Sequence, residues 1–301
     1  MGKTTVSAAL ANAAAQAGLS TLIVEVEGKS GLADLYGQAA FDYHEVTLSP
    51  GGGPDGAAAV RARTLTPDDA LIEYLRDHGM SRISKRLVTT GAVDIVATAA
   101  PGIKDILVLG KVKQLERGDR FDLIVLDAPA AGHAISFLRS ARGLLDAVRV
   151  GPINTQAADV LEMLTDPERC QVVLVTLPEE TPVNELVETA FSLEDEVGVS
   201  LGPVVVNGLY PPIGALEVDP EDAAVRAGVT LRPGEAAALR AAARFRQQRG
   251  ALQDEQLERL ADRLPLPQIR LPYVFSADLG PADLDGLTAS LVAGIEGLTP
   301  L

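Results

Sequence analysis

Residues 122–133 read DLIVLDAPAAGH, and this stretch decides the fold class of the chain. The run DLIVLD is short and apolar, which predicts a strand buried on both faces of a sheet. It ends on Asp127, and the loop that follows contains Pro129 and Gly132. Ligands of open α/β sheets bind at the carboxyl ends of the strands. We therefore expect Asp127 at a ligand-binding edge, although a turn with a capping aspartate would have the same local sequence.

Other apolar runs of the same kind alternate with helical patterns. The predicted strands cover residues 20–27 (STLIVEVE), 171–177 (QVVLVTL), 203–207 (PVVVN) and a short last one at 271–275. The predicted helices cover residues 6–17, 67–91, 102–117, 183–197, most of 219–264, and 283–298. Strands that alternate with helices imply right-handed crossovers and parallel pairing. The predicted fold is α/β, with a doubly wound, mostly parallel sheet.

Composition limits the classes of partner and compartment. The chain has 301 residues, of which 47% are hydrophobic, so one large domain is expected. Its formal net charge of −15 opposes binding to nucleic acid or to anionic lipid. No apolar run is long enough to span a bilayer, and Cys170 is the single cysteine. We expect a cytoplasmic protein without nucleic acid and without stable membrane insertion.

The chain begins Met1-Gly2-Lys3-Thr4-Thr5, which matches only the end of the phosphate-loop pattern G-x-x-x-x-G-K-[ST]. A predicted helix follows, and backbone N–H groups at a helix start can face a phosphate. In that pattern Lys3 reaches the β- and γ-phosphates, while the Thr4 hydroxyl holds Mg²⁺. An ordinary N-terminus can carry the same triplet, so the motif needs support from elsewhere in the chain.

That support comes from segments which together resemble one known family. Gly2-Lys3-Thr4-Thr5 matches the end of the deviant Walker loop K-G-G-V-G-K-T-T, and residues 126–138 (LDAPAAGHAISFL) resemble the second switch D-T-A-P-T-G-H-T-L-R-F-L. Glu27 starts the segment that replaces the first switch D-P-A-H. Asn207 and Pro272 fall in segments that resemble the family's base-binding loops. The chain resembles the ArsA-like ATPases, in the branch of ArsA and the tail-anchored-protein-targeting ATPases, and most closely a bacterial subgroup encoded as adjacent pairs.

The resemblance implies ATP and Mg²⁺ as cofactors and assigns roles to single residues. It places Glu27 at the attacking water and Thr4 and Asp127 at Mg²⁺, with Glu27 and Asp127 as catalytic residues. It places the remaining residues around the nucleotide, namely Gly2, Lys3, Thr4, Thr5, Gly132, His133, Asn207 and Pro272. For His133, a structural hydrogen-bonded histidine remains the alternative to a nucleotide sensor.

The resemblance also implies a domain plan. Residues 1–301 would form a single P-loop ATPase domain that lacks its first strand, with a helical subdomain at about 65–115 together with 140–165. Met1 stands at the valine position of the loop, so we expect the upstream DNA to encode a strand and K-G-G. Mg²⁺-dependent hydrolysis would drive a nucleotide-controlled homodimer, or a heterodimer with a paralogous ATPase. With a lone cysteine and three methionines, the cargo stays open.

Two other functions remain open at this point. The altered first switch is compatible with a nucleotide-binding but inactive partner of an active paralogue. A ParA- or MinD-like positioning ATPase is the other alternative. A ParA-like protein would need to bind DNA, which the charge of −15 opposes. A MinD-like protein would need a basic membrane helix at its end, and residues 281–301 contain no lysine or arginine that could form one.

Overall fold

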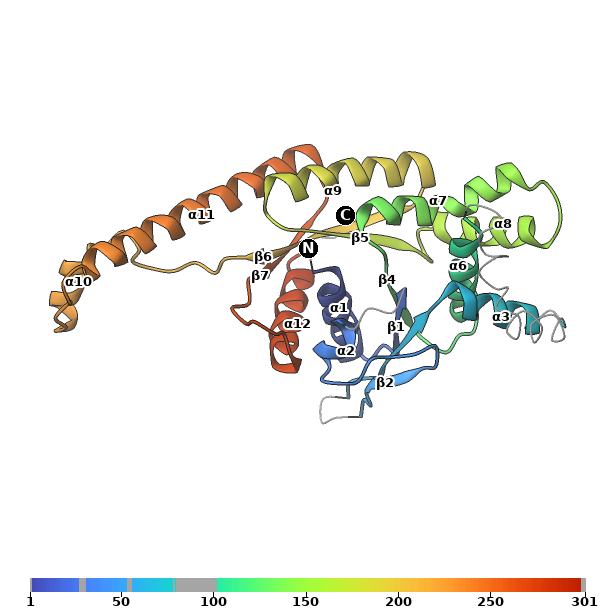
Figure 1. Cartoon of the computed structure of the whole chain (residues 1–301), viewed down its shortest axis with the longest axis horizontal. Coiled ribbons are helices and arrows are strands. Elements are labelled where there is room, and N and C mark those ends of the chain that lie inside the picture. The colour runs from blue at the N-terminus through green and yellow to red at the C-terminus, as the bar shows by residue number, and fades with distance from the viewer. Residues whose placement is uncertain (1, 27–30, 53–55, 78, 80–101, 299–301) are drawn as a thin grey trace.

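The computed structural model describes residues 2–26, 31–52, 56–77, 79 and 102–298. Its strands form two sheets (Figure 1). The first has the order β2-β3-β1-β4, with β1 at Thr21–Val26, β2 at Val46–Ser49, β3 at Val60–Leu65 and β4 at Leu123–Asp127. The second has the order β5-β6-β7, with β5 at Gln171–Thr176, β6 at Ser200–Leu209 and β7 at Gln268–Pro272. All pairings are parallel except that of β2 with β3.

Helices cover both faces of these sheets. On one face lie α1 at Lys3–Gln16, α2 at Gly31–Leu35 and α12 at Pro281–Glu296. The other face is covered by α6 at Ile103–Glu116, α7 at Ala131–Ala147, α8 at Pro152–Thr165, α9 at Glu180–Ser192 with the π-helical turn Leu193–Val197, and the end of α11 at Glu235–Arg263. Helix α3 at Pro67–Asp77 packs on α6, and α10 spans Pro220–Ala227. The prediction of a doubly wound α/β fold is confirmed.

Strand β1 lies in the middle of the first sheet, and all six of its residues are buried. Its side chains alternate between the two cores, with Leu22 and Val24 on the α6–α7 side and Ile23 on the α1 side. Helix α1 packs closely there because its inner face is alanine, and Ala8, for example, is fully buried. The same two cores contain residues of β5, β6 and β7, so both sheets share one pair of helical layers.

The predicted single sheet is divided between β4 and β5. Among the described residues, β4 pairs only with β1, and β5 pairs only with β6. Apolar side chains of both edge strands, such as Leu126 and Val173, are partly exposed, unlike those of β1. Each sheet therefore ends on a parallel strand that has an open hydrogen-bonding side.

Several element boundaries differ from those expected. Strands β2 and β3 were not predicted, because β3 reads VRARTL and contains two arginines. The last strand starts at Gln268 and ends at Pro272, after which the chain leaves the sheet. The predicted helix at 67–91 is observed as α3 up to Asp77, and most of its remainder lies outside the described residues.

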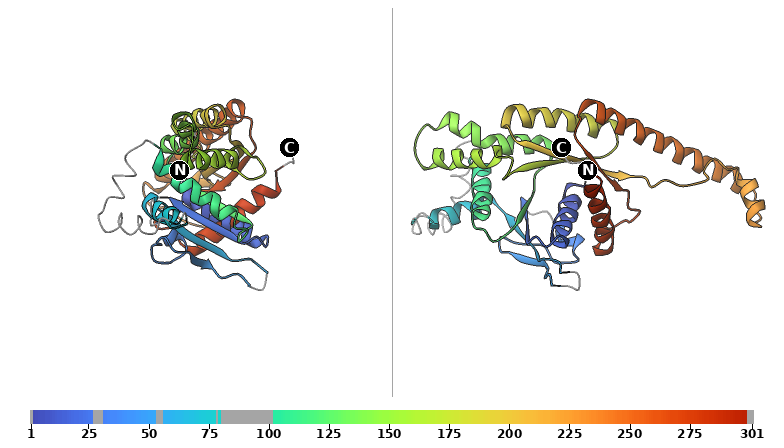
Figure 2. Two further views of the ribbon diagram at one scale, coloured as in Figure 1. Left: turned by 90° about the vertical axis from the view of Figure 1, so that its right-hand side faces the viewer. Right: turned by 180° about the vertical axis from the view of Figure 1, so that it is seen from behind.

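The most extended feature is α11, which has 29 residues. Its buried residues, Gln253, Gln256, Leu257 and Leu260, all lie in the second half of the helix, and α10 has none. The first half of α11 and α10 therefore project away from the sheets as an arm (Figures 1 and 2). In the part of the chain that the structure describes, no helix has the length and apolarity needed to cross a membrane.

Candidate nucleotide site

The N-terminus of α1 lies at the carboxyl edge of the first sheet. Gly2 caps the helix in the left-handed conformation with φ of 84°, and its carbonyl accepts the first helical hydrogen bond from the Val6 N–H at 2.9 Å. Lys3, Thr4 and Thr5 form the first turn and are partly exposed. Their backbone N–H groups have no partner within the helix, and such helix starts bind anions.

Thr4 and Asp127 are in direct contact. The Thr4 hydroxyl donates to Oδ2 of Asp127 at 2.7 Å, and the Ser7 hydroxyl lies 3.3 Å from Oδ1. Asp127 is the last residue of β4 and is only 6% exposed. The structure therefore brings together the two residues assigned to Mg²⁺, and a hydroxyl beside a carboxylate is a donor set of the kind that Mg²⁺ prefers.

Sequence reasoning gave no role to Glu25, which lies next to Asp127. Glu25 is 2% exposed, and its Cα is paired in the sheet with those of Asp127 and Thr64. The Thr64 hydroxyl donates to Oε2 of Glu25 at 3.2 Å. A signal existed in the sequence, because an acidic residue inside an apolar strand is unusual unless it has a specific partner.

The other switch residues are only partly described. Glu27, the predicted catalytic residue, lies outside the described residues. Gly132 and His133 form the exposed first turn of α7, where the His133 N–H donates to the Ala130 carbonyl at 2.8 Å. His133 also lines a small cavity of about 100 Å³ together with Val26, the last residue of β1. The second switch therefore lies beside the end of the strand that precedes Glu27.

Asn207 and Pro272, the residues expected near the base, lie on adjacent strands of the second sheet. The Asn207 side chain lies against Gly2, because a Cβ added to Gly2 would be 2.3 Å from its Nδ2. Pro272 is paired with Leu209, and the Tyr273 N–H donates to the Leu209 carbonyl at 2.7 Å. The structure thus brings Asn207 to the phosphate-loop end of α1.

Exposed aromatic residues follow these two strands. Tyr273 is 44% and Phe275 is 73% exposed, and their ring centroids are 4.7 Å apart. Tyr210 lies beside both rings, and the Arg246 guanidinium lies 4.3 Å from the centroid of the Tyr210 ring. Sequence reasoning did not identify this cluster, because its members come from three separate segments.

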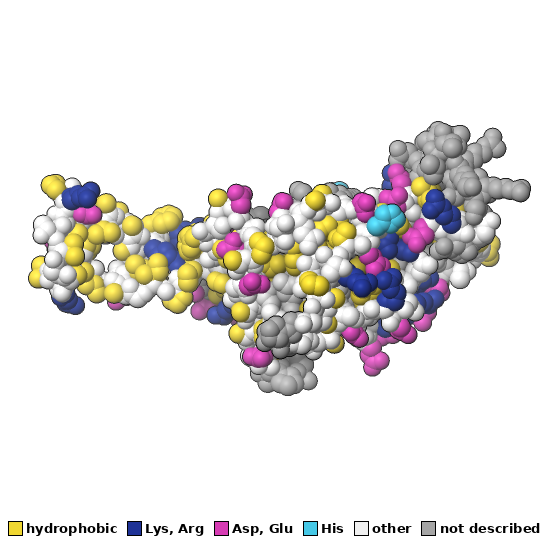
Figure 3. Space-filling view, turned by 90° about the horizontal axis from the view of Figure 1, so that it is seen from below, with side chains coloured by type: hydrophobic (Ala, Val, Ile, Leu, Met, Phe, Trp, Pro, Cys, Tyr) yellow, Lys and Arg dark blue, Asp and Glu magenta, His cyan; other side chains and the backbone are white. Residues whose placement is uncertain are grey.

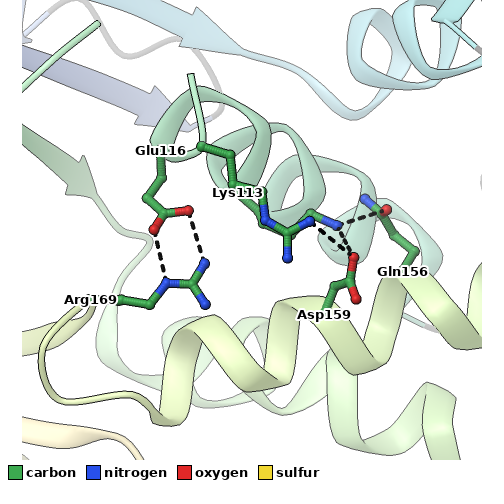
Figure 4. A network of polar contacts seen from close by, with 6 residues as sticks. Lys113, Glu116, Gln156, Asp159 and Arg169 are labelled. Atoms are coloured by element: carbon green, nitrogen blue, oxygen red, sulfur yellow. Dashed lines mark hydrogen bonds and ion pairs between the residues drawn. The ribbon is translucent and has the colours of Figure 1, made fainter. Parts of the chain in front are cut away.

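A second polar cluster joins α6 to α8 (Figure 4). Lys113, which is 7% exposed, donates to Asp159 at 2.8 Å and lies 3.3 Å from Gln156. The hydrogen bond from Lys113 lowers the pKa of Asp159. Glu116 accepts two hydrogen bonds of 2.9 Å from Arg169, and the pKa of Glu116 is lowered for that reason.

This second cluster borders a larger cavity of about 720 Å³ between α3, α6 and α8. Lys111 and Glu73 lie on its wall and form an ion pair at 2.6 Å. The charged groups around it are paired with one another across helices. The cluster therefore holds the helices together, and it lies apart from the contact between Thr4 and Asp127.

Comparison with known proteins identifies the family of the chain. Residues 1–150 match the family described as anion-transporting ATPase. ATPase BagA of Mycobacterium tuberculosis is 30% identical over 303 residues, which cover 93% of this chain and 86% of that protein. A putative arsenical pump-driving ATPase of Halobacterium salinarum is 26% identical over 317 residues, which cover 99% of this chain and 44% of that protein.

A plant protein is also similar. ATPase GET3B of Arabidopsis thaliana is 26% identical over 264 residues, which cover 70% of this chain and 62% of that protein. The similarity to these proteins extends well beyond the short motif at the N-terminus. The chain belongs to the ArsA-like ATPase family and is an ATPase.

Proposed function

We propose that this ATPase hydrolyses ATP with Mg²⁺ at the edge formed by α1, β1 and β4. The observation that carries the proposal is the 2.7 Å hydrogen bond between Thr4 and Asp127. In P-loop enzymes a loop threonine and a strand-end aspartate hold the ion. When bound, Mg²⁺ neutralises charge that develops on the phosphates.

Several residues of this chain have separate roles at the phosphates. Lys3 contacts the β- and γ-phosphates, together with the backbone N–H groups at the start of α1. The backbone N–H of Gly132 faces the γ-phosphate, and His133 stands next to it. Glu27 orients the attacking water.

The base is held at the second sheet. Asn207 contacts adenine, and Pro272 borders it. The packing of Asn207 against Gly2 supports this, because the Asn207 side chain lies beside the glycine that opens α1. The Cβ of any larger residue at position 2 would displace Asn207.

The function is tested by phosphate release from the full-length protein, including any residues that its gene encodes before Met1. We expect turnover with Mg²⁺, none in EDTA, and a strong loss in Asp127→Asn. Turnover that persists in EDTA would contradict the Mg²⁺ assignment. Unchanged turnover in Asp127→Asn would remove Asp127 from the site.

The domain plan includes one further strand between β4 and β5. The open sides of these two strands and their partly exposed apolar side chains support it. One parallel strand there would join the two sheets and lead directly into Gly2. We also assign α3, α6 and α8 to the helical subdomain, because Lys111 on α6 pairs with Glu73 on α3 and Lys113 on α6 pairs with Asp159 on α8 (Figure 4 shows the second pair).

The protein acts as a dimer, either with itself or with a paralogous ATPase. The arm of α10 and α11 supports a contact with a partner, because Val225, Val229 and Phe245 are 81%, 58% and 63% exposed. Apolar and basic side chains gather on this arm in the view of Figure 3. Residues 226–249 contain six arginines and one glutamate, although the whole chain carries a net charge of −15. Apolar surface of this kind marks interaction sites.

A second candidate is an inactive nucleotide-binding partner of an active paralogue. The observation that favours it is the glutamate at position 27, where the family carries aspartate. Single-turnover hydrolysis with and without the paralogous subunit separates the active enzyme from the inactive partner.

The relatives named as arsenical pump-driving ATPases suggest an anion as one class of cargo. We also propose a cytoplasmic location for the protein.

A further inference from the structure

The segment that carries Asn207 leaves the regular ladder of the second sheet. On one side, β5 ends at Thr176, whose register partner on β6 is Val206. On the other side, the register with β7 shifts between Val206 and Leu209, because β6 has one more residue there than β7. A bulge of this kind bends the strand and re-aims a side chain, and bulges are common beside active sites. Asn207 lies within this bulge.

Gly208 gives the bulge its backbone shape. Its φ is 77°, in the left-handed region that favours glycine. The strand then rejoins β7, where the Leu209 carbonyl accepts a hydrogen bond from the Tyr273 N–H at 2.7 Å. The Gly208 carbonyl and the Tyr210 N–H, on either side of Leu209, lie past the last register pair with β5. These partly buried groups therefore need a partner from outside the ladder.

Gln253 on α11 is that partner. Its Nε2 donates to the Gly208 carbonyl at 3.1 Å, and its Oε1 accepts from the Tyr210 N–H at 2.9 Å. The side chain is only 6% exposed. One buried amide thus makes two hydrogen bonds of the kind that a neighbouring strand would make, one as donor and one as acceptor. The backbone is held directly after Asn207.

The direction of the Asn207 side chain depends on this backbone, because a side chain leaves the chain along its Cα–Cβ bond. The space around the amide is narrow, since a Cβ added to Gly2 would be 2.3 Å from Nδ2 of Asn207. We propose that Gln253 is a positioning residue for Asn207 and aims its amide at the base. The inference rests on the proposed contact of Asn207 with adenine and deepens it, because it makes the root of the arm part of the base subsite.

The competing explanation is that Gln253 only satisfies the two backbone groups and thereby attaches α11 to the sheet. Gln253→Met tests this, because it keeps the approximate length of the side chain and removes both hydrogen bonds. Gln256→Met is the matched control: Gln256 is 8% exposed on the same helix, and its Oε1 has no hydrogen-bond partner. Gln253→Asn, with the amide on a shorter side chain, is a second and milder variant.

The experiment is isothermal titration of the full-length protein with ADP and with pyrophosphate, which has two phosphates but no adenosine. Each variant is measured below its melting transition. We expect Gln253→Met to bind ADP about 5-fold more weakly, or worse, as for the loss of one or two hydrogen bonds, and to bind pyrophosphate as the wild type does. Gln253→Asn should change in the same direction, and Gln256→Met should match the wild type with both ligands.

A double variant shows whether Gln253 acts through Asn207. Asn207→Ala should itself weaken ADP binding and leave pyrophosphate binding unchanged. In the Asn207→Ala background, Gln253→Met should cause no further loss of ADP affinity, whereas the losses from two independent sites would add. A role in stability alone would not produce this coupling.

Unchanged ADP affinity in Gln253→Met, an equal loss of pyrophosphate affinity, or additive losses in the double variant would each overturn the inference and leave the proposed function intact. Failure of both Gln253 variants to fold would assign the residue to stability alone and would also overturn it. An Asn207→Ala protein that binds ADP as tightly as the wild type would instead remove the base contact from the proposed function.

Discussion

The hydroxyl of Thr4 donates a 2.7 Å hydrogen bond to Oδ2 of Asp127, although 123 positions separate the two residues. The bond joins the first turn of α1 to the carboxyl end of β4. The Thr4 hydroxyl uses its proton in this bond, so its oxygen lone pairs remain available to a metal ion.

Asp127→Asn should reduce turnover by about 100-fold or more while ATP affinity changes little. Asparagine keeps the shape and an acceptor for Thr4 but removes the charge that acts on the metal in the transition state. Steady-state kinetics and equilibrium ATP binding measure the two effects separately. Ser7→Ala is the control, because it removes only the longer 3.3 Å contact and should keep most of the activity.

Lys3→Ala should weaken ATP binding by about 10-fold or more, because the ammonium group contacts the phosphates in the ground state as well as in the transition state. Isothermal titration with ATP and with ADP gives the affinity. Lys104→Ala, on α6, provides a control with the same loss of charge. A Lys3→Ala protein that binds ATP as tightly as the wild type would contradict the phosphate assignment.

Glu27→Gln should nearly abolish turnover, and Glu27→Asp should slow it, with ATP affinity kept in both. The water must be held close to the γ-phosphate, and a displacement of about 1 Å can cost on the order of 100-fold. Single-turnover hydrolysis of the three proteins is the measurement. Wild-type rates in Glu27→Gln would instead favour the inactive-partner function.

Asp159→Asn should destabilise the fold by about 1–2 kcal/mol at neutral pH, because it leaves the buried ammonium of Lys113 without its counter-charge. The effect should be smaller than for a fully buried pair, since the Asp159 side chain is 31% exposed. Urea unfolding gives the free energy. Asp146→Asn, at an exposed position, is the control.

The effect of Asp159 should also depend on pH. Its pKa is lowered in the folded state by Lys113, so its stabilisation is present above the unfolded pKa of about 3.9 and is lost as the pH falls through the folded value. The difference between wild type and Asp159→Asn should therefore shrink in strong acid. A difference that stays constant down to about pH 2 would contradict the ion pair.

Some of the fold could be predicted from local pattern. The runs at 20–27, 122–127 and 171–177 were recognised as strands because parallel strands buried on both faces are continuously apolar. Strand β3 was not recognised, because Arg63 suggests exposure. In the structure Arg63 is 7% exposed, and its guanidinium lies 4.4 Å from the centroid of the Tyr43 ring. The contact that covers Arg63 comes from Tyr43, which lies outside this strand.

The candidate site, like the fold, could be predicted from the sequence only in part. The sequence by itself determined that Asp127 ends an apolar strand and that a helix follows the Gly-Lys-Thr motif, because apolar runs and helical patterns are encoded by neighbouring residues. Tertiary structure decided that these residues meet and that Asn207 lies against Gly2. It also decided that Glu25 stands beside Asp127, because the register between strands is set by the packing of side chains from segments far apart in the chain, which no local pattern records.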